Sequence, residues 1–393
     1  MGKDAYGRKL RGGMVGGAPG AFIGPVHRMA ATMDGEAEFV AGCFSRDPAR
    51  SKQAGQALHL DPARVYDGYL EMAEHEARKP AGERLDFVSI VVTTSYHYEV
   101  ARCFVEHGFN VVCDKPMTTS LEDARALRDL VKKAGTAFVL THNYTGYPMV
   151  KEARHRVASG ELGRINKVVV EYPQGWLSQL VEGGASGIDM WRMDPAQAGP
   201  SNCTGDIGIH AENLCRYVTG LEIEELCAEV SSFIPGHPLD DDSMMLLRFK
   251  GGAKGILYAS QISSGEENGL SIRVYGTRKG LQWWQEEPNY LVLKDPAGFQ
   301  TRLSRGNPDL VCEIAKEYMR TPFGHPEGFI EAFANVYREG FKTIRAQVAA
   351  DRDPEADHPT VDDGVAGLAF ITTVLESAQS DRKWTKMDRR SPM

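Results

Sequence analysis

Residues 109–121 read FNVVCDKPMTTSL, a short apolar run that stops at Asp114-Lys115-Pro116. The run predicts a buried strand, and Pro116 has no N–H with which to continue a hydrogen-bonded ladder. Lys115 is therefore expected at the end of a central strand, which is where open α/β sheets bind their ligands. A solvated surface lysine is the alternative interpretation, because most lysines face water.

Strands and helices alternate on both sides of this stretch. We predict strands at residues 10–16, 39–44, 86–93, 109–113 and 137–141, and helices at 26–33, 49–58, 69–77, 98–107 and 121–134. Ser120, followed three residues later by Asp123, has the pattern of an N-cap for the last of these helices. Alternation with short connections predicts a parallel, doubly wound sheet over residues 1–147.

The turn between the first strand and the first helix is rich in glycine and reads GGAPGAFIG over residues 16–24. Such a turn lets backbone N–H groups approach a pyrophosphate at a helix N-terminus. The spacing departs from a regular G-x-G-x-x-G, and an ordinary loop is the alternative interpretation. Cofactor contacts are expected at Gly16, Gly17, Gly20, Phe22 and Ile23.

The second strand ends at Ser45-Arg46-Asp47, the position that meets the adenosine ribose in a dinucleotide-binding fold. An acidic residue there binds the 2′-hydroxyl of NAD, whereas an arginine accommodates the 2′-phosphate of NADP. Ser45 and Arg46 favour NADP. NAD remains possible because Asp47 is the next residue. Arg46 could also be a solvated loop residue.

Residues 148–393 follow a different pattern, which predicts an α+β domain with an open-faced, mostly antiparallel sheet. We expect strands at residues 165–172, 226–234, 243–249, 254–261, 270–275, 280–284 and 290–293, and helices at 149–159, 206–218, 327–348 and 363–380. Gly251-Gly252 predicts a hairpin turn. The last helices are expected to pack back toward the first domain. The irregular section 173–203 is long enough to suggest a functional loop.

Asp206 and His210 lie four residues apart at the start of a predicted helix, so both project from one face. An imidazole can take a proton from a hydroxyl at neutral pH while a carboxylate orients it or holds the substrate. A hydrogen-bonded structural pair is the alternative. No His-Glu-x-x-His occurs and one Asp/His pair is too few ligands, so no metal site is predicted.

Composition limits the classes of partner and the compartment. The 393 residues suggest two domains, and the net charge of -8 without a basic block argues against nucleic acid or an anionic membrane surface as a partner. Seven cysteines without a Cys-x-x-Cys pair indicate reduced thiols. With no signal peptide or apolar span recognised, we expect a cytoplasmic protein.

Together these motifs resemble the Gfo/Idh/MocA dehydrogenases, the family of glucose-fructose oxidoreductase, inositol dehydrogenase and the rhizopine-catabolism proteins. The resemblance rests on the residue 16–24 loop followed by His27, on Cys113-Asp114-Lys115-Pro116, and on Trp191-Arg192-x-Asp194 leading to Gly205-Asp206-x-Gly208-x-His210. It implies an N-terminal Rossmann domain, a C-terminal open-faced sheet domain, and reversible hydride transfer between NAD or NADP and a carbinol of a sugar, glycoside or cyclitol. It also implies a homodimer or homotetramer formed through the C-terminal sheet.

The resemblance assigns roles to single residues. Lys115 matches the lysine of the family's Glu-Lys-Pro motif, Asp206 its catalytic-site aspartate, and His210 its proton-transferring histidine. Asp114 stands where glutamate is commoner, which keeps a carboxylate beside Lys115. Residues 93–97 are one residue shorter than the usual Thr-Pro-Asn-x-x-His, which leaves the nicotinamide contacts of Thr93, Thr94 and His97 open.

The remaining expected contacts come from two other stretches. Asp114 and Asn143 are expected to contact the cofactor, and substrate contacts are expected at Lys115, Tyr144, Trp191, Arg192, Asp206 and His210. Aromatic faces pack against sugar rings and charged groups bind hydroxyls; core packing is the alternative interpretation for Trp191.

Two other functions are compatible with the same fold. One is a cofactor-binding regulator without catalysis. A sensor needs no proton-transfer groups, so this function is disfavoured by the presence of Lys115, Asp206 and His210. The other is a glycosidase that acts by transient oxidation with tightly held NAD.

Overall fold

The computed structural model describes residues 7–183, 190–348 and 357–387. The chain divides into two compact units, which we call the first and the second unit. The first unit consists of residues 1–143 and 333–365, and the second of residues 144–332 and 366–393. Helices α12 (Phe329–Val348) and α13 (Val361–Ala378) each contribute residues to both.

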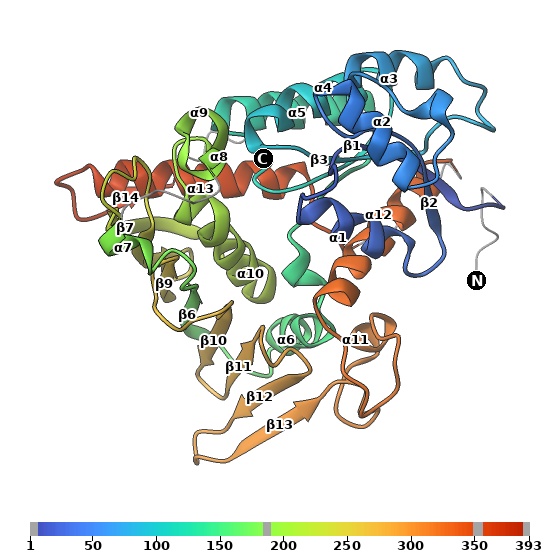
Figure 1. Cartoon of the computed structure of the whole chain (residues 1–393). Helices are drawn as coiled ribbons and strands as arrows, with labels where there is room; N and C mark the ends of the chain where they lie inside the picture. The colour runs from blue at the N-terminus through green and yellow to red at the C-terminus, as the bar shows by residue number, and fades with distance from the viewer. Residues whose placement is uncertain (1–6, 184–189, 349–356, 388–393) are drawn as a thin grey trace. The chain divides into compact units, whose positions relative to one another are not determined.

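The first unit is built on a five-stranded parallel sheet with the strand order β2-β1-β3-β4-β5 (Figure 1). Its strands are β1 (Leu10–Gly16), β2 (Ala37–Cys43), β3 (Phe87–Val91), β4 (Asn110–Cys113) and β5 (Phe138–Leu140). Its helices are α1 (Ile23–Thr32), α2 (Pro48–Ala57), α3 (Tyr69–Ala77), α4 (His97–Glu106) and α5 (Leu121–Ala134). Figure 1 shows α3, α4 and α5 on one face of this sheet and α1 and α12 on the other. The predicted doubly wound parallel sheet is confirmed.

Local sequence determines where β4 stops and α5 begins. The strand ends at Cys113, and the chain turns away at Asp114-Lys115-Pro116, as expected from a proline that cannot donate to the ladder. The Ser120 hydroxyl accepts a hydrogen bond from the Asp123 N–H at 3.1 Å, so the predicted N-cap is confirmed. Lys115 is thereby placed at the carboxyl end of a central strand.

Helix α12 supplies part of the apolar cover of this sheet. The Phe341 ring lies 5.1 Å from the ring of Phe87 on β3, measured between centroids. A Cβ added at Gly340 would lie 2.6 Å from a side-chain carbon of Val139 on β5, so the helix backbone approaches the strand as closely as glycine allows. Residues from the far end of the sequence therefore complete the core of the first unit.

The second unit contains a nine-stranded sheet with the order β13-β12-β11-β10-β6-β9-β8-β7-β14, in which only β6 and β9 pair in parallel among the described residues. Its strands are β6 (Ile165–Pro173), β7 (Ile223–Ser231), β8 (Asp242–Phe249), β9 (Lys254–Ser260), β10 (Ser271–Gly276), β11 (Gly280–Trp284), β12 (Tyr290–Lys294), β13 (Gln300–Ser304) and β14 (Thr385–Lys386). Its helices are α6 (Pro148–Ala158), α7 (Leu180–Gly183), α8 (Met190–Met193), α9 (Pro195–Ala198), α10 (Ile209–Thr219) and α11 (Glu313–Glu317). The predicted, mostly antiparallel sheet is confirmed.

One face of this sheet packs against helices α6 and α10. Along β8 and β9, Met245, Leu247 and Leu257 are buried, whereas the alternate residues Leu246 and Ile256 are exposed. Leu246 and Ile256 pair with each other across the two strands. Alternation of this kind leaves one apolar face of the sheet outside the core of the unit.

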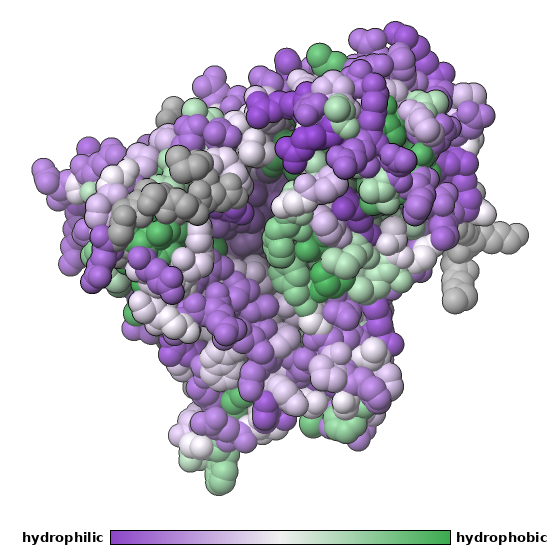
Figure 2. All heavy atoms as spheres, in the orientation of Figure 1, coloured by the Kyte–Doolittle hydropathy of each residue, from purple (hydrophilic) through white to green (hydrophobic). Residues whose placement is uncertain are grey.

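The surface and the cysteines complete the description. Figure 2 shows mostly hydrophilic residues on the visible face, with hydrophobic residues gathered in smaller groups. In the part of the chain that the structure describes, no helix is long and apolar enough to cross a membrane. All seven cysteines are free thiols.

Candidate active site

The glycine turn of the first unit joins β1 to α1 where the backbones come very close. Gly16 has a φ of 88°, and a Cβ on it would lie 2.5 Å from the carbonyl oxygen of Val91. A Cβ on Gly24 would lie 2.5 Å from the Cα of Gly17. Phe22, 76% exposed, precedes α1 and provides no side-chain cap. An uncapped helix N-terminus beside a glycine-lined turn suits the pyrophosphate of a dinucleotide.

The tip of β2 carries the residues expected to select the coenzyme. The Arg46 Nη1 donates a hydrogen bond to the hydroxyl of Tyr96 at 3.0 Å, and the guanidinium lies 5.3 Å from the centre of that ring. Asp47 caps α2, because its carboxylate accepts a hydrogen bond from the Ala49 N–H at 2.9 Å. The acidic residue at this tip is therefore engaged within its own helix, while Arg46 is exposed.

His97 connects the segments that follow β3 and β4. Its imidazole is buried, with Nδ1 2.6 Å from the carbonyl oxygen of Pro116 and Nε2 3.1 Å from that of Val92. Burial lowers the pKa of His97, while the nearby Asp114 and the two carbonyl groups act in the opposite direction. His97 thus supports the backbone immediately after Lys115. Thr94, also predicted to contact cofactor, is buried beside it, and Thr93 is partly exposed.

Asp114 is the charged member of a network of polar side chains inside the first unit. Its carboxylate accepts a hydrogen bond from the Thr141 hydroxyl at 2.8 Å and lies 3.9 Å from His27 Nε2. His27 is fully buried on α1, and its Nδ1 lies 2.7 Å from the hydroxyl of Tyr337. Burial alone would raise the pKa of Asp114, but the nearby His27 and Lys115 lower it well below its usual range.

This arrangement predicts a pH-dependent loss of stability in Asp114→Asn. At pH 7 we expect the variant to be less stable by about 2 kcal/mol or more, because a charged hydrogen-bond acceptor in a buried network is lost. The folded pKa of Asp114 is lowered, so its contribution is complete above about pH 4 and disappears as the pH falls through the folded value. Urea unfolding at pH 7 and below pH 4 measures both effects. Asp67→Asn, whose carboxylate forms an ion pair with Lys52 in which both side chains are exposed, should cost less than about 1 kcal/mol.

Asn143 follows β5 and carries an unsatisfied donor. The residue is 3% exposed, and its Nδ2 has no hydrogen-bond partner among the described residues. A buried amide donor usually finds a partner, because leaving it unpaired costs free energy. The glycine turn and this donor together fit a nicotinamide dinucleotide, with which Asn143 was predicted to interact.

In the second unit, Asp206 and His210 lie on successive turns around the start of α10. Asp206 belongs to a π-helical turn (Thr204–Gly208), where the sequence predicted an ordinary helix. Such turns are frequent at functional sites. The carboxylate of Asp240 fixes the entry to this turn by accepting hydrogen bonds from the backbone N–H groups of Asn202 and Thr204, both at 2.7 Å.

The carboxylate of Asp206 is held by polar neighbours in the second unit. Gln261 Nε2 donates a hydrogen bond to Asp206 Oδ2 at 3.0 Å, and Arg192 Nε lies 4.0 Å from the same oxygen. The Asp206 side chain remains 28% exposed. The predicted substrate residues Asp206 and Arg192 are thus brought together, and a carboxylate with partial access to solvent can accept a ligand hydroxyl.

His210 packs against a closed ring of hydrogen bonds. The Tyr144 ring meets the imidazole edge-on, with centroids 4.8 Å apart. Tyr172 donates to Asn268 Oδ1 at 2.7 Å, Asn268 Nδ2 donates to Tyr144 at 3.3 Å, and the two tyrosine hydroxyls lie 2.5 Å apart. With these directions the remaining bond runs from Tyr144 to Tyr172. Burial raises the pKa of both tyrosines, so both stay neutral. Their hydrogen bonds hold the aromatic rings in place beside His210.

Trp191 and Arg192 lie on α8, directly after residues 184–189, which are outside the described part of the chain. The guanidinium of Arg192 lies 4.5 Å from the centre of the Trp191 ring, within the range of a cation–π contact. Trp176 is a further exposed aromatic residue, and its Nε1 donates to Gln174 Oε1 at 3.1 Å. The predicted functional loop therefore presents aromatic and cationic groups from the second unit.

Each unit holds its own part of the predicted site. The first contains the glycine turn, Arg46, His97, Asn143 and Lys115, and the second contains Tyr144, Trp191, Arg192, Asp206 and His210. Among the residues that the structure describes, no group of three or more His, Cys, Asp or Glu side chains could hold a metal ion.

Sequence reasoning missed the residues that orient this site, chiefly Gln261, Tyr172 and Asn268. Gln261 had a usable signal, because it is the last residue of the predicted strand 254–261 and, like Lys115, lies at a strand end. Tyr172 and Asn268 had none, since they interact across 96 residues of sequence.

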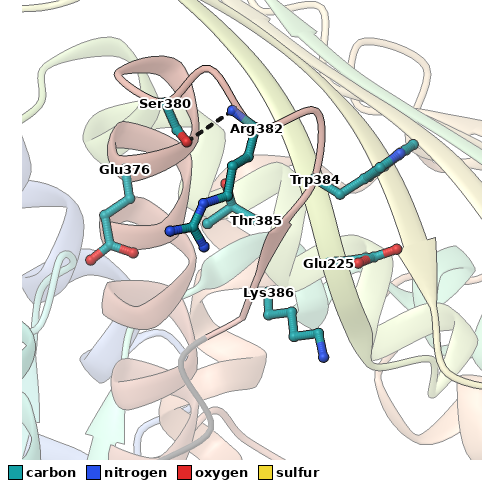
Figure 3. Close-up of a pocket in the computed structure, with 7 residues that line it drawn as sticks. All are labelled: Glu225, Glu376, Ser380, Arg382, Trp384, Thr385 and Lys386. Atoms are coloured by element: carbon teal, nitrogen blue, oxygen red, sulfur yellow. Dashed lines mark hydrogen bonds between the residues drawn. The ribbon is translucent and has the colours of Figure 1, made fainter.

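A separate pocket of about 450 Å³ lies beside β14 in the second unit (Figure 3). Its lining consists of Glu225, Glu376, Ser380, Arg382, Trp384, Thr385 and Lys386. Trp384 already stacks with the guanidinium of Arg248 at 3.8 Å, and the acidic and basic groups are mixed. None of the predicted site residues lines it, and this mixture matches no single class of charged ligand.

Comparison with known proteins supplies the family context. A family described as "Oxidoreductase family, NAD-binding Rossmann fold" matches residues 10–142, and the GFO/IDH/MocA C-terminal domain matches residues 150–282. An uncharacterized oxidoreductase, YfiI of Bacillus subtilis, is 30% identical over 392 residues, which cover 98% of each chain.

Solved structures agree with these matches over almost the whole chain. An oxidoreductase from Sinorhizobium meliloti is 42% identical with a TM-score of 0.86, covering 96% of this chain and all of the other. An inositol dehydrogenase homolog from Azotobacter vinelandii, solved with NADH and myo-inositol, is 32% identical with a TM-score of 0.89, covering 98% of this chain and 99% of the other.

Proposed function

Since the chain belongs to the GFO/IDH/MocA family of NAD-binding oxidoreductases, we propose that it transfers a hydride between NAD or NADP and a secondary alcohol of a sugar, glycoside or cyclitol. The resemblance suggested by the sequence motifs is thereby confirmed at the level of the family.

The observation that carries the proposal is the arrangement of Asp206 and His210. Asp206 is held by Gln261 and partly exposed, and His210 is supported one turn later by Tyr144. A protein that only senses a nucleotide has no need of a positioned carboxylate and imidazole. The binding of myo-inositol by the Azotobacter relative supports a polyhydroxylated ring as the substrate class.

The chemistry follows from what each side chain can do. The glycine turn and Asn143 would hold the nicotinamide coenzyme, which would supply the acceptor or donor of the hydride. As the hydride leaves the carbon of a secondary alcohol, the hydroxyl proton must also leave, and we assign its acceptor as His210. The ammonium of Lys115 stabilises the negative charge that develops on the oxygen, and Asp206 accepts a substrate hydroxyl. In the reverse direction the same groups return the proton to the carbonyl oxygen.

A spectrophotometric screen tests this function. Inositols, glucosides and anhydrosugars are each offered with NAD and with NADP, and a dehydrogenase accumulates reduced coenzyme. A glycosidase acting by transient oxidation would release sugar with no net change in coenzyme absorbance. A regulator would bind coenzyme and leave every substrate unchanged.

For the coenzyme we propose a preference for NADP, supported by the exposed Arg46 and by the engagement of Asp47 in capping α2. Ser45 and Arg46 then meet the 2′-phosphate. Thr93, Thr94, His97, Asp114 and the glycine-turn residues keep their predicted cofactor roles.

Arg46→Ala tests that preference. We expect the KM for NADP to rise by about tenfold or more, because a charge-assisted hydrogen bond to phosphate is lost, while the KM for NAD changes little. Arg50→Ala, at an exposed position on α2, serves as the matched control. If Arg46→Ala used NADP as well as the wild type does, the proposed contact between Arg46 and the 2′-phosphate would be wrong.

We also propose that a second copy of the chain covers the free sheet face, as predicted for a homodimer or homotetramer. Leu246, Ile256 and Met244 are large apolar residues exposed on adjacent strands, and faces of this kind mark protein contacts. Sedimentation of the full chain at micromolar concentration should give a mass of two or four copies, and a monomer would contradict the proposal.

The free thiols support a cytoplasmic location.

A further inference from the structure

We propose that Gln261 is a positioning residue that holds the carboxylate of Asp206 in one orientation, and that Asn202 fixes Gln261 for this task. The proposal rests on the proposed function, because it concerns how the substrate-binding carboxylate is prepared for the reaction.

Asn202, Gln261 and Asp206 form a chain of two hydrogen bonds, which we call the relay, and both bonds run toward Asp206. Asn202 Nδ2 donates to Gln261 Oε1 at 2.8 Å, which leaves the Gln261 amide nitrogen to donate to Asp206 Oδ2 at 3.0 Å. Exchanging the oxygen and nitrogen of Gln261 would face a donor with a donor and an acceptor with an acceptor. The amide of Gln261 is therefore fixed in one orientation by its two neighbours.

Both members of the relay are immobilised by their surroundings. Gln261 is completely buried, and its backbone N–H donates to the Asp241 carbonyl at 2.9 Å. The Leu177 N–H donates to the Gln261 carbonyl at 3.0 Å. Asn202 is also buried, and its N–H donates to the Asp240 carboxylate. The donor that reaches Asp206 is thus held by the sheet on one side and by the entry to the π-helical turn on the other.

Such a donor acts on the charge of Asp206 as well as on its rotamer. A buried N–H that donates to a carboxylate stabilises the ionised form relative to the protonated form. An ionised carboxylate accepts hydrogen bonds only, so it selects a hydroxyl of the substrate. Gln261 therefore holds the Asp206 carboxylate where it can accept a hydroxyl of the substrate.

Gln261→Glu isolates this single interaction. The substitution keeps the shape of the side chain and the acceptor for Asn202, but replaces the donor by a carboxylate oxygen about 3 Å from Asp206. Two carboxylates so close cannot both ionise readily, and they share a proton. The folded pKa of the introduced glutamate is then raised above its unfolded value. Its contribution to stability is therefore complete at low pH and is lost as the pH rises through the folded value.

The first measurement is the Tm of the full chain between about pH 5 and about pH 8. Relative to wild type, the Tm of Gln261→Glu should fall by about 5 °C or more across this range. The double variant Asp206→Asn with Gln261→Glu should lose this pH dependence, because the introduced asparagine can donate to the introduced glutamate. The control is Gln282→Glu, a buried glutamine on β11 that accepts a hydrogen bond from Lys294. Its Tm relative to wild type should show no such fall.

The second measurement is the ratio of kcat/KM between Gln261→Glu and wild type on an alcohol that the screen identifies. The ratio should fall by about tenfold or more from about pH 6 to about pH 9, as the shared proton leaves. A constant Tm difference together with a constant activity ratio would overturn the proposal, because loss of packing alone does not depend on pH.

The two measurements also separate this inference from the proposed function. If the wild type oxidises no alcohol while the Tm series shows the fall, the proposed function is wrong and the link between Gln261 and Asp206 is supported. If the wild type is active and both variants behave as the control does, the function stands and the link is wrong.

Discussion

Replacement of Lys115 by methionine is expected to lower kcat by about a hundredfold or more while leaving coenzyme binding nearly intact. The reason lies in the place of Lys115 after β4, where Asp114 precedes it and His97 holds the carbonyl of Pro116. Methionine preserves much of the apolar stem but removes the ammonium. Negative charge on the reacting oxygen then loses its stabilising partner, and such charge is stabilised most strongly where water is excluded.

Two measurements separate an effect on the chemical step from an effect on coenzyme binding. Single-turnover rates report the chemical step, and fluorescence titration with reduced coenzyme reports the dissociation constant. Lys133→Met, at an exposed position on α5, makes the same substitution away from the site and should leave both unchanged. Parallel loss of rate and of coenzyme binding in Lys115→Met would indicate a role in folding instead.

Replacement of His210 by glutamine is the second large effect that we expect. Glutamine can still form hydrogen bonds but cannot take up a proton, so kcat should fall by about a hundredfold or more. Where wild-type kcat/KM changes with pH around neutrality, the variant should lose that change, because histidine is the side chain that titrates there. Substrate binding should weaken far less than turnover.

The control for this variant is His155→Gln on α6, which is partly exposed and absent from the site. The pH profile of kcat/KM and the substrate KM are compared in all three proteins. A profile in His210→Gln with the same shape as wild type would assign the proton transfer to another group. Loss of the packing between His210 and Tyr144 would by contrast reduce stability without removing the pH dependence.

Local chemistry was enough to predict much of this protein from sequence. The apolar run before Pro116 located the end of β4, and Ser120 and Asp123 located the start of α5. The alternation of strands and helices predicted the parallel sheet, and Gly251-Gly252 predicted the hairpin between β8 and β9. For the strand end, the helix start and the hairpin, the determining residues lie within a few positions of the feature that they determine.

Features that depend on distant partners could not be predicted in the same way. Strand β14 has two residues and is extended because it pairs with β7, more than a hundred residues earlier. The π-helical turn that carries Asp206 depends on the carboxylate of Asp240. The link from Gln261 to Asp206 spans 55 residues, and nothing in the sequence indicates that these two residues contact each other. Such contacts arise only once the sheet has been assembled.

The interleaving of the two units has a consequence for biosynthesis. The coenzyme-binding unit begins at the N-terminus, yet its last segment, residues 333–365, leaves the ribosome only after residues 144–332. A fragment that stops at residue 143 would lack Tyr337 and Phe341, and so would expose Phe87 and leave His27 without its hydroxyl partner. The nucleotide fold of this chain is consequently finished only after residues 144–332 have been translated, and it could be produced alone only with helix α12 supplied.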